Sequence, residues 1–526
     1  MNRERMIREI QERPDGWDVI IIGGGATGLG AAVDAVSRGL RTLLLEQQDF
    51  AKSTSSKSTK LIHGGLRYLE QGNLHLVMEA LKERGILCAN APHLIHHLPF
   101  LIPAYHWWEK PYYGIGVKIY DLLARELGIE KSKHLSRKQA LHAIPTLQSQ
   151  NLRGGTVYFD GQFDDSRLAL CLAKTAADSG AVLVNYMKVT GLIKNANICC
   201  GVKAIDVETE QSYQLQGKVI INATGVFSDA ILHRDNPKAK EIIAPSQGIH
   251  LVLPQSFLPG SHALLIPHTR DKRILFMIPW HERVLLGTTD TPLSKISLEP
   301  RPLDKEIDFL LEHASHYLKK GPSTRDIVSL FAGLRPLIKV RKNTNTSSLS
   351  RDHSIFISPS QLITIAGGKW TTYRKMAEDV IDKAILVGKL PSRSSATYTL
   401  KLHGWEKVDP LIPLSTYGTD AKEIRGLIKE KKALGDLLHP ALPYIWAEVV
   451  WCIRNEMART VEDVLARRTR CLLLDARLSI SLAPRVAKLL AKELQRSERW
   501  EKDQIADYTR LAEQYCVESY GSFTHR

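Results

Sequence analysis

Two runs of apolar residues with a helical pattern between them mark the first organised part of this chain. Residues 18–22 and 42–45 are short, largely apolar runs, which predict buried strands. Between them, residues 29–37 carry apolar side chains at helical spacing. A strand, a helix and a second strand in this order predict a parallel β–α–β unit.

Similar patterns follow along the chain. Further strands are predicted at residues 182–186, 202–207, 218–223 and 362–366, and helices at residues 72–90, 168–179 and 371–386. Residues 246–350 alternate short strands with turns, which is typical of an antiparallel sheet. Beyond Pro391 the chain is helical and highly charged, with its best helical patterns at residues 446–458 and 461–468.

These patterns predict three domains in an α/β protein. The expected first domain contains the β–α–β unit and is discontinuous, with residues 1–91, 150–245 and 351–390. The second comprises residues 92–149 and 246–350, and the third is a helical C-terminal domain at residues 396–526. The composition, 44% apolar and 24% charged over 526 residues, agrees with two or three globular domains.

Charge and cysteine content narrow the class of protein. The net charge of +15 favours anionic partners such as phosphate metabolites or anionic lipid. We expect no nucleic-acid partner, because the charge is spread along the chain and no nucleic-acid-binding module is present. The seven cysteines form no C-x-x-C pair, so reduced thiols, a cytoplasmic location and no metal site are expected. The charged N-terminus does not resemble a secretory signal, and no apolar run is long enough to span a membrane.

The first β–α–β unit carries the spacing of a dinucleotide site. Gly23, Gly25 and Gly28 follow the first strand in a G-x-G-x-x-G pattern, and Glu46 closes the unit 18 positions after Gly28. The glycines allow a tight turn, a close approach to the pyrophosphate and close packing of helix on strand. The helix N-terminus attracts the pyrophosphate, and an acidic residue at this distance accepts from ribose hydroxyls.

Several later segments resemble one family of flavoproteins, the FAD-dependent glycerol-3-phosphate dehydrogenases. The resemblance rests on residues 53–68 (STSSKSTKLIHGGLRY), 222–225 (NATG), 333–336 (GLRP), 350–352 (SRD) and 366–374 (AGGKWTTYR). Residues 248–252 and 467–470 look most like the mitochondrial branch, but the transit peptide, N-terminal membrane segment and calcium-binding extension of that branch do not appear. We therefore expect a bacterial, calcium-independent member.

The resemblance implies a fold, a reaction and a cofactor. The expected fold is a Rossmann-type FAD-binding domain with an antiparallel β substrate domain, as in D-amino-acid oxidase, plus an α-helical C-terminal domain. The expected reaction oxidises sn-glycerol 3-phosphate to dihydroxyacetone phosphate and passes electrons to ubiquinone or menaquinone. The expected FAD contacts are Gly23, Gly25, Ala26, Thr27, Gly28, Glu46, Ser53, Thr54, Ser55, Ser56, Ala223, Gly225, Gly367, Gly368 and Thr371. Thr371 is as well suited to capping the following helix.

Three arginines in family-like segments are candidates for the substrate phosphate, because a planar guanidinium can bind it bidentately. They are Arg67, Arg335 and Arg351, and surface ion pairs are the alternative for each. His63 and His250 are candidates for the base that takes the hydroxyl proton, or for hydrogen bonding to the flavin. Lys369 is expected to contact substrate or the reduced flavin.

The sequence leaves open two rival functions and the identity of the partners. An oxygen-using oxidase of the same fold, acting on glycerol 3-phosphate or on another hydroxy acid or amine, would release hydrogen peroxide. A non-catalytic flavin-binding assembly protein would not respond to substrate. A quinone reductase must reach the bilayer, so we expect peripheral binding at the inner face of a bacterial membrane. A homodimer is left open. The arginines at 467–470 suit either anionic lipid or a solvated helix face, whereas the stripe formed by Trp446, Val449, Val450 and Ile453 predicts core.

Overall fold

Eight strands form a mainly parallel sheet around the predicted β–α–β unit. The computed structural model describes residues 1–520 except 14, 67–68, 70–71, 125–128, 272 and 340–351. The sheet order is β17 (His353–Ile357), β18 (Ile363–Gly367), β10 (Ser212–Asn222), β1 (Trp17–Ile22), β2 (Thr42–Leu45) and β7 (Val182–Val184), with β8 (Met187–Asn195) and β9 (Ile198–Asp206) continuing from β10. β1 lies parallel to both β2 and β10 and is buried along its whole length, as in parallel sheets covered on both faces.

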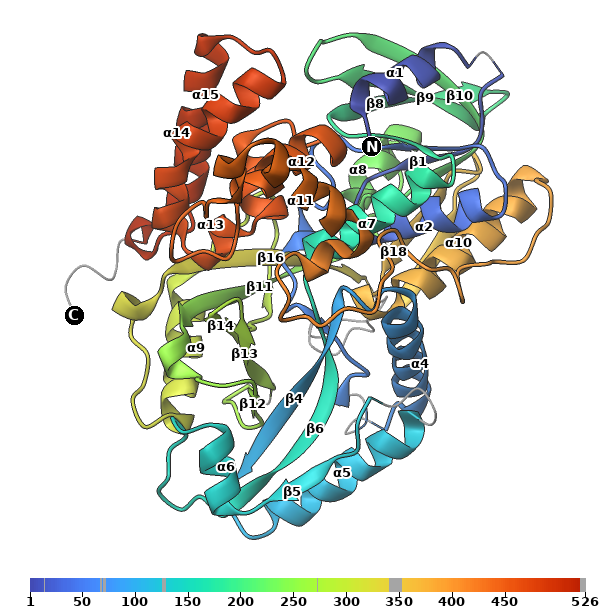
Figure 1. Cartoon of the computed structure of the whole chain (residues 1–526). Coiled ribbons are helices and arrows are strands. Elements are labelled where there is room, and N and C mark those ends of the chain that lie inside the picture. The colour runs from blue at the N-terminus through green and yellow to red at the C-terminus, as the bar shows by residue number, and fades with distance from the viewer. Residues whose placement is uncertain are drawn as a thin grey trace.

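Helices pack against this sheet and against one another. α2 (Ala26–Ser37) contacts both α7 (Asp165–Asp178) and α10 (Tyr373–Gly388), and Figure 1 shows the three helices together beside β1. Two further helices complete this part of the chain, α1 (Arg3–Gln11) and α8 (Ser228–Asp235). α2 can lie close to β1 because a side chain at Gly28 would meet the Gly23 carbonyl oxygen at 1.9 Å.

A second, ten-stranded sheet is mostly antiparallel. Its order is β15 (Thr291–Pro292), β11 (Ile243–Pro254), β14 (Arg283–Gly287), β13 (Leu275–Trp280), β12 (Ala263–Ile266), β4 (Ile95–Ala104), β6 (Gly154–Phe163) and β3 (Leu61–Ile62), with β16 (Ser329–Ile338) paired to β11 and β5 (Lys133–Leu135) to β6. The helices around it are α4 (Leu74–Asn90), α5 (Glu109–Ala124), α6 (Arg137–Ala143) and α9 (Asp304–Tyr317). The two sheets together confirm the predicted fold class.

The sheets differ from the predicted domain boundaries in two places. β6 and β3 belong to the antiparallel sheet, although the sequence assigned both to the nucleotide-binding domain. β6 is buried at nine of its ten positions, so its sequence lacks the polar alternation that distinguishes a half-buried antiparallel strand. Its ten-residue ladder with β4 is a tertiary pairing that the pattern of either segment does not specify.

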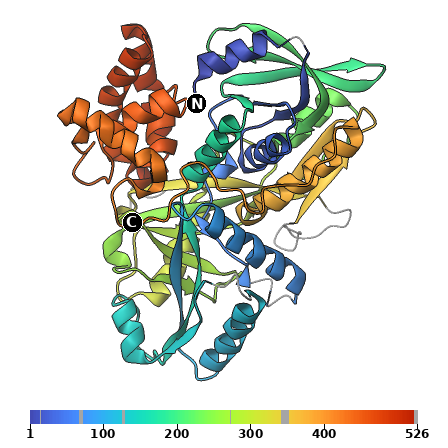
Figure 2. The same cartoon turned by 45° about the vertical axis from the view of Figure 1, so that its right-hand side comes forward.

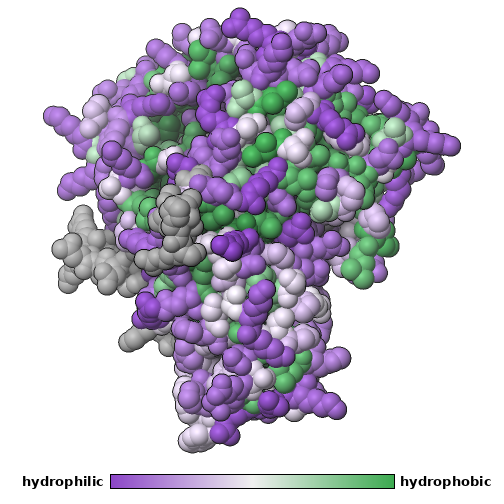
Figure 3. Space-filling model, turned by 90° about the vertical axis from the view of Figure 1, so that its left-hand side faces the viewer, coloured by the Kyte–Doolittle hydropathy of each residue, from purple (hydrophilic) through white to green (hydrophobic). Residues whose placement is uncertain are grey.

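The C-terminal part is helical, and Figures 1 and 2 show it as a separate lobe beside the parallel sheet. Its elements are α11 (Ala421–Glu430), α12 (Trp446–Asn455), a π-helical segment η10 (Asp463–Arg468), α13 (Cys471–Leu474), α14 (Ala476–Glu493) and α15 (Glu498–Glu513). Trp446, Val449, Val450 and Ile453 are all buried, which confirms the prediction of a core stripe. Hydrophilic residues cover most of the face in Figure 3, with smaller hydrophobic areas between them. Within the described ranges, none of the helices is at once long and apolar enough to span a bilayer.

Candidate functional site

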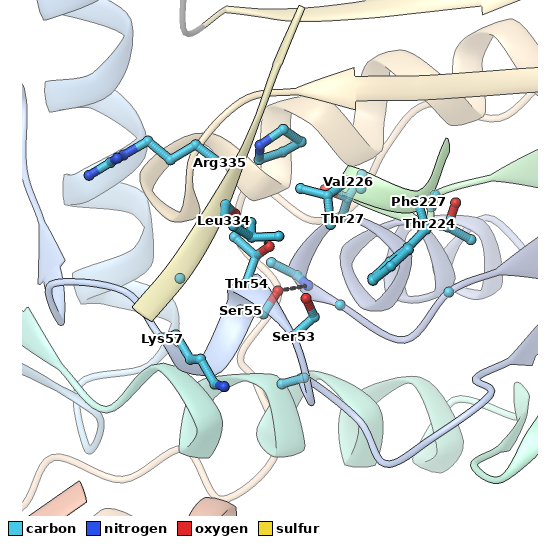
Figure 4. Close-up of a pocket in the computed structure, with 18 of the residues that line it drawn as sticks. Thr27, Ser53, Thr54, Ser55, Lys57, Thr224, Val226, Phe227, Leu334 and Arg335 are labelled. Atoms are coloured by element: carbon cyan, nitrogen blue, oxygen red, sulfur yellow. Dashed lines mark hydrogen bonds between the residues drawn. The ribbon is translucent and has the colours of Figure 1, made fainter. Parts of the chain in front are cut away.

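One large cavity lies where the parallel sheet meets the antiparallel sheet. From the parallel sheet its wall takes the turn after β1, Glu46 after β2, and the segments following β10 and β18. From the antiparallel sheet it takes residues of β3, β11 and β16, with Thr288 directly after β14. The loop at residues 51–59 joins the two sides. Figure 4 shows Thr27, Thr224 and Phe227 on one side of this cavity and Arg335 projecting on the other.

The glycine turn has the conformation that a dinucleotide requires. Gly23 has φ +111°, and a side chain there would meet the Ala223 carbonyl oxygen at 2.8 Å. Gly23, Gly25, Ala26 and Thr27 all line the cavity, at the N-terminus of α2. Gly28 lies behind the turn, where it allows helix and strand to pack closely, so its predicted role in the motif is packing rather than contact.

Glu46 lies on the cavity wall with its carboxylate held in place. Its Oε2 accepts from the Gly24 backbone N–H at 2.6 Å and its Oε1 from the Gln48 N–H at 2.8 Å. Burial raises the pKa of Glu46, and these two backbone bonds oppose the rise. Each carboxylate oxygen can accept a second hydrogen bond, so the group can still receive ribose hydroxyls.

The serine-rich loop forms a short 3-10 turn, η1 (Thr54–Ser56), between the two sheets. The Ser55 hydroxyl accepts from the Ala26 backbone N–H at 2.9 Å, and the Thr54 hydroxyl donates to the Leu334 carbonyl at 2.7 Å. Ser53, Thr54 and Ser55 line the cavity. Ser56 is buried beneath them, and its hydroxyl donates to the Ser53 carbonyl at 3.3 Å.

The segments after β10 and β18 complete the nucleotide side. Ala223, Gly225, Gly367, Gly368 and Thr371 line the cavity, and the three glycines have φ values of +58°, +81° and +80°. The Thr371 hydroxyl accepts from the His63 backbone N–H at 3.3 Å, and the N-cap of α10, Thr372, makes no side-chain cap bond. Thr371 therefore joins two cavity segments instead of capping the helix.

Several residues of this wall were not predicted from the sequence. Thr224 stands between the two predicted residues Ala223 and Gly225, so its segment already carried the signal. Phe227 and Arg234, in and after the 3-10 turn that follows β10, also line the cavity. Nothing in the pattern of α8 distinguishes Arg234 from a surface arginine, because its position at the cavity depends on how α8 packs.

Arg335 is the arginine that the described residues bring to the substrate side. Its Nη2 donates to the Thr289 carbonyl at 2.8 Å, and its Nη1 donates to the Gln247 carbonyl at 3.1 Å. The carboxylate of Asp290 lies 3.4 Å from Nη1. Two backbone carbonyls, the Thr288 hydroxyl and the Asp290 carboxylate thus help to orient the guanidinium. Arg67 and Arg351 lie outside the described residues.

His63, His250 and Lys369 share this cavity wall with Arg335. His250 stacks on Phe331 at 5.0 Å between ring centroids, and its Nε2 lies 2.9 Å from the Thr59 hydroxyl. Burial, with the nearby charges of Lys60 and Arg335, holds the pKa of His250 well below its usual value, so the ring is neutral at physiological pH. Its Nδ1 has no hydrogen-bond partner among the described residues. Lys369 begins the turn that precedes α10.

The geometry fits a dinucleotide with a redox-active end. A glycine cradle, a helix N-terminus and an acidic side chain occupy one side, and an arginine with histidines occupies the other. In the described ranges, no group of three His, Cys, Asp or Glu side chains is arranged to hold a metal ion.

Comparison with known proteins gives the class and then the family. The model of FAD dependent oxidoreductases matches residues 18–373, and that of the C-terminal domain of alpha-glycerophosphate oxidase matches residues 360–502. The chain is thus an FAD-dependent oxidoreductase. It is 39% identical to mitochondrial glycerol-3-phosphate dehydrogenase of Mus musculus, over 97% of this chain and 75% of that protein. The corresponding mitochondrial enzyme of Arabidopsis thaliana is also 39% identical, over 95% of this chain and 86% of that protein.

A solved structure extends the match to the whole fold. Glycerol-3-phosphate dehydrogenase from Bacillus halodurans, complexed with FAD, is 30% identical, with a TM-score of 0.77 over 98% of this chain and 97% of that one. The chain belongs to the FAD-dependent glycerol-3-phosphate dehydrogenase family. The predicted family and cofactor are confirmed, whereas the roles of individual site residues stay predictions.

Proposed function

We propose that this chain oxidises sn-glycerol 3-phosphate to dihydroxyacetone phosphate with bound FAD and passes the electrons to a respiratory quinone. The observation that supports the substrate most directly is Arg335, which faces the same cavity as the glycine cradle. A guanidinium is positively charged at physiological pH and can bind a phosphate dianion bidentately. The relatives' names carry the same substrate.

Each side chain of the substrate side has a task that its chemistry allows. When bound, FAD supplies the two-electron acceptor for the hydride from C2. Arg335 would bind the phosphate and so fix the distance of C2 from the glycine-lined wall. His250 or His63 would accept the hydroxyl proton, since a neutral imidazole nitrogen can do so. Lys369 would bind the substrate or offset negative charge that develops at the flavin end.

Anaerobic substrate titration tests the reaction directly. The purified holoenzyme would be mixed with glycerol 3-phosphate, glycerol, glycerol 2-phosphate and a phosphorylated hydroxy acid, and flavin absorbance would be recorded. We expect bleaching with sn-glycerol 3-phosphate alone at low concentration. Equal bleaching by glycerol would contradict a phosphate-binding arginine, and no bleaching by any substrate would favour the non-catalytic alternative.

Oxygen is the rival acceptor, and the C-terminal match to a domain of alpha-glycerophosphate oxidase is the observation that favours it. An oxidase and a dehydrogenase would bleach alike without oxygen, so the acceptor needs its own assay. We expect turnover with a water-soluble ubiquinone or menaquinone analogue to exceed hydrogen peroxide release in air. The reverse order would assign the chain as an oxidase.

A candidate membrane surface supports the quinone proposal. α5 and the residues before it expose a row of large apolar side chains: Trp107, Trp108, Tyr112, Ile115, Ile119 and Leu122, with Ile115 62% and Leu122 76% exposed. Lys118, Lys131 and Lys133 are exposed nearby in the sequence. Apolar residues that enter the interface beside lysines suit an anionic bilayer surface, and α5 forms the outer edge of the antiparallel part in Figure 1.

Vesicle sedimentation tests this surface. We expect Ile115→Glu and Leu122→Glu to weaken binding to phosphatidylglycerol-containing vesicles by roughly tenfold or more each, because burying such a side chain contributes about 1.5–3 kcal/mol. The matched control is Leu386→Glu, which changes a residue 71% exposed on α10. Equal binding by all three variants would exclude α5 as the docking surface. Fractionation of the source cell would test the inner membrane face, and sedimentation velocity would test the homodimer.

A further inference from the structure

The arginines at 467–470 face the interior, contrary to both expectations from the sequence. Arg467 and Arg468 are each 3% exposed and Arg470 is 1% exposed, so neither lipid contact nor a solvated face is correct. All three reach from the C-terminal lobe into the loop between β2 and β3. This loop contains η1, and Thr54 and Ser55 of that turn line the cavity.

Two of these arginines converge on the first part of that loop. Arg467 Nε donates to the Asp49 carboxylate at 2.5 Å, and Arg468 Nη2 donates to the same carboxylate at 3.0 Å. Asp49 is fully buried, and the two guanidinium groups hold its pKa below the usual value despite burial. Lys52, three residues further on, pairs with Glu462 of the C-terminal lobe and with Glu299 at 2.8 Å.

The third arginine holds the end of η1. Arg470 Nη2 donates to the Ser56 carbonyl at 2.8 Å and to Asp165 at 3.0 Å, while its Nη1 donates to the Ala466 carbonyl at 3.1 Å. The Ser56 carbonyl also accepts from Lys60 Nζ at 3.0 Å. Arg470 therefore joins the loop backbone, α7 and its own segment through one rigid fork, which a lysine ammonium cannot reproduce.

The opposite side of η1 contacts three separate walls of the cavity. Ser55 accepts from the Ala26 N–H of the glycine turn, and its carbonyl accepts from Trp370 Nε1 at 2.9 Å. Thr54 donates to the carbonyl of Leu334, the residue before Arg335. A shift of this turn would thus move the nucleotide turn, the segment after β18 and the arginine strand relative to one another.

We propose that Arg470, with Arg467 and Arg468, is a positioning residue for FAD and substrate: the C-terminal lobe sets the position of η1 and through it the geometry of the cavity. The inference rests on the proposed function, because it assumes that FAD lies against η1 and substrate against Arg335. A purely structural role would leave unexplained why all three guanidinium groups meet on a loop that joins both sides of the cavity.

Paired lysine variants test the proposal. Arg470→Lys is compared with Arg38→Lys, because Arg38 is equally buried and paired with Asp34 at 2.7 Å, but lies at the far end of α2 from the glycine turn. Unfolding temperature, the FAD dissociation constant of the reconstituted apoprotein, and KM and kcat for glycerol 3-phosphate would be measured for both. Arg467→Lys serves as a second variant if Arg470→Lys does not fold.

We expect both variants to lose thermal stability, and Arg470→Lys alone to raise the FAD dissociation constant and KM about tenfold each, with a smaller change in kcat. Equal FAD affinity and equal KM in the two variants would overturn the proposal. The FAD titration contains no substrate, so it decides the positioning of the cofactor even if glycerol 3-phosphate is not the substrate.

Discussion

Arg335 and Arg467 show how the same side chain serves two purposes. Arg335 lies on the cavity wall, 20% exposed, with backbone carbonyls and the more distant Asp290 around it. Arg467 lies in the interior and pairs with three carboxylates, Asp49, Glu462 and Asp463, at 2.5, 2.5 and 2.6 Å. Arg335 thus faces the cavity, whereas the charge of Arg467 is compensated within the fold.

The two cases show that location, more than residue type, decides whether an arginine can reach a ligand or pairs only within the fold. A buried guanidinium without carboxylates would carry a large desolvation penalty, so interior arginines are found with their partners. At a cavity wall, water or an anionic ligand can also solvate or pair with the guanidinium. Four substitutions would test this contrast.

Removing the shared carboxylate should affect folding most. Asp49→Ala leaves Arg467 and Arg468 without their common partner, and breaking such a buried pair costs about 3–5 kcal/mol. Asp382→Ala is the control, since Asp382 pairs with Arg38 but is 53% exposed. Urea denaturation would measure both variants. Similar losses of unfolding free energy would show that burial does not govern the contribution of these pairs.

Removing the cavity arginine should affect substrate rather than folding. Arg335→Ala is expected to lower kcat/KM for glycerol 3-phosphate by roughly a hundredfold, because two charge-assisted hydrogen bonds to phosphate contribute about 3 kcal/mol or more together. Arg335→Lys should recover part of the loss. Arg234→Ala, at the other side of the cavity, is the matched control and should leave the ratio of phosphorylated to unphosphorylated substrate unchanged. An unaltered ratio in Arg335→Ala would remove the phosphate assignment.

A carboxylate on the cavity wall should behave as a ligand contact in the same way. Glu46→Ala is expected to weaken FAD by roughly ten- to a hundredfold, since losing a hydrogen bond to a charged group costs about 1.5–3 kcal/mol. Glu46→Gln, which keeps one acceptor for Gly24 or Gln48, should lose less. Flavin retention after dialysis and fluorescence titration would report the affinity. Full retention by Glu46→Ala would exclude its contact with the ribose.

Two carboxylates of the C-terminal part, Glu462 and the buried Glu448, extend the contrast to pH. Lys52 and Arg467 hold the pKa of Glu462 at about 2 against desolvation, whereas burial raises the pKa of Glu448 from 4.5 to about 7. Glu448 therefore binds its proton more tightly in the folded state. Its contribution to stability is present below about pH 4.5 and is lost as the pH rises towards 7.

Glu448→Gln should remove this dependence. Between pH 4.5 and 7 the wild type should lose up to about 1.4 kcal/mol per pH unit relative to the variant, because one proton separates the two states. Denaturation at a series of pH values would give the slopes. Parallel profiles for the two proteins would mean that Glu448 is ionised throughout, as Glu462 is.

The nucleotide side of the cavity could be predicted from local sequence. The glycine turn, the N-terminus of α2 and Glu46 belong to one β–α–β unit, so their mutual positions follow from about thirty consecutive residues. Ligand binding there depends mainly on backbone conformation, and the glycine spacing predicts that conformation directly. The antiparallel pattern after residue 246 and the helical C-terminal part were likewise predictable from local periodicity.

Which buried charges pair with one another depends on tertiary packing. Arg467 and Asp49 are 418 positions apart, and Arg470 and Ser56 are 414 positions apart, so no local pattern relates them. The same limit explains why β6 pairs with β4 in the antiparallel sheet, and why Arg234 reaches the cavity while the arginines at 467–470 do not. Periodicity specifies which face of an element is apolar, but the packing of the domains determines which residue pairs with a buried charge.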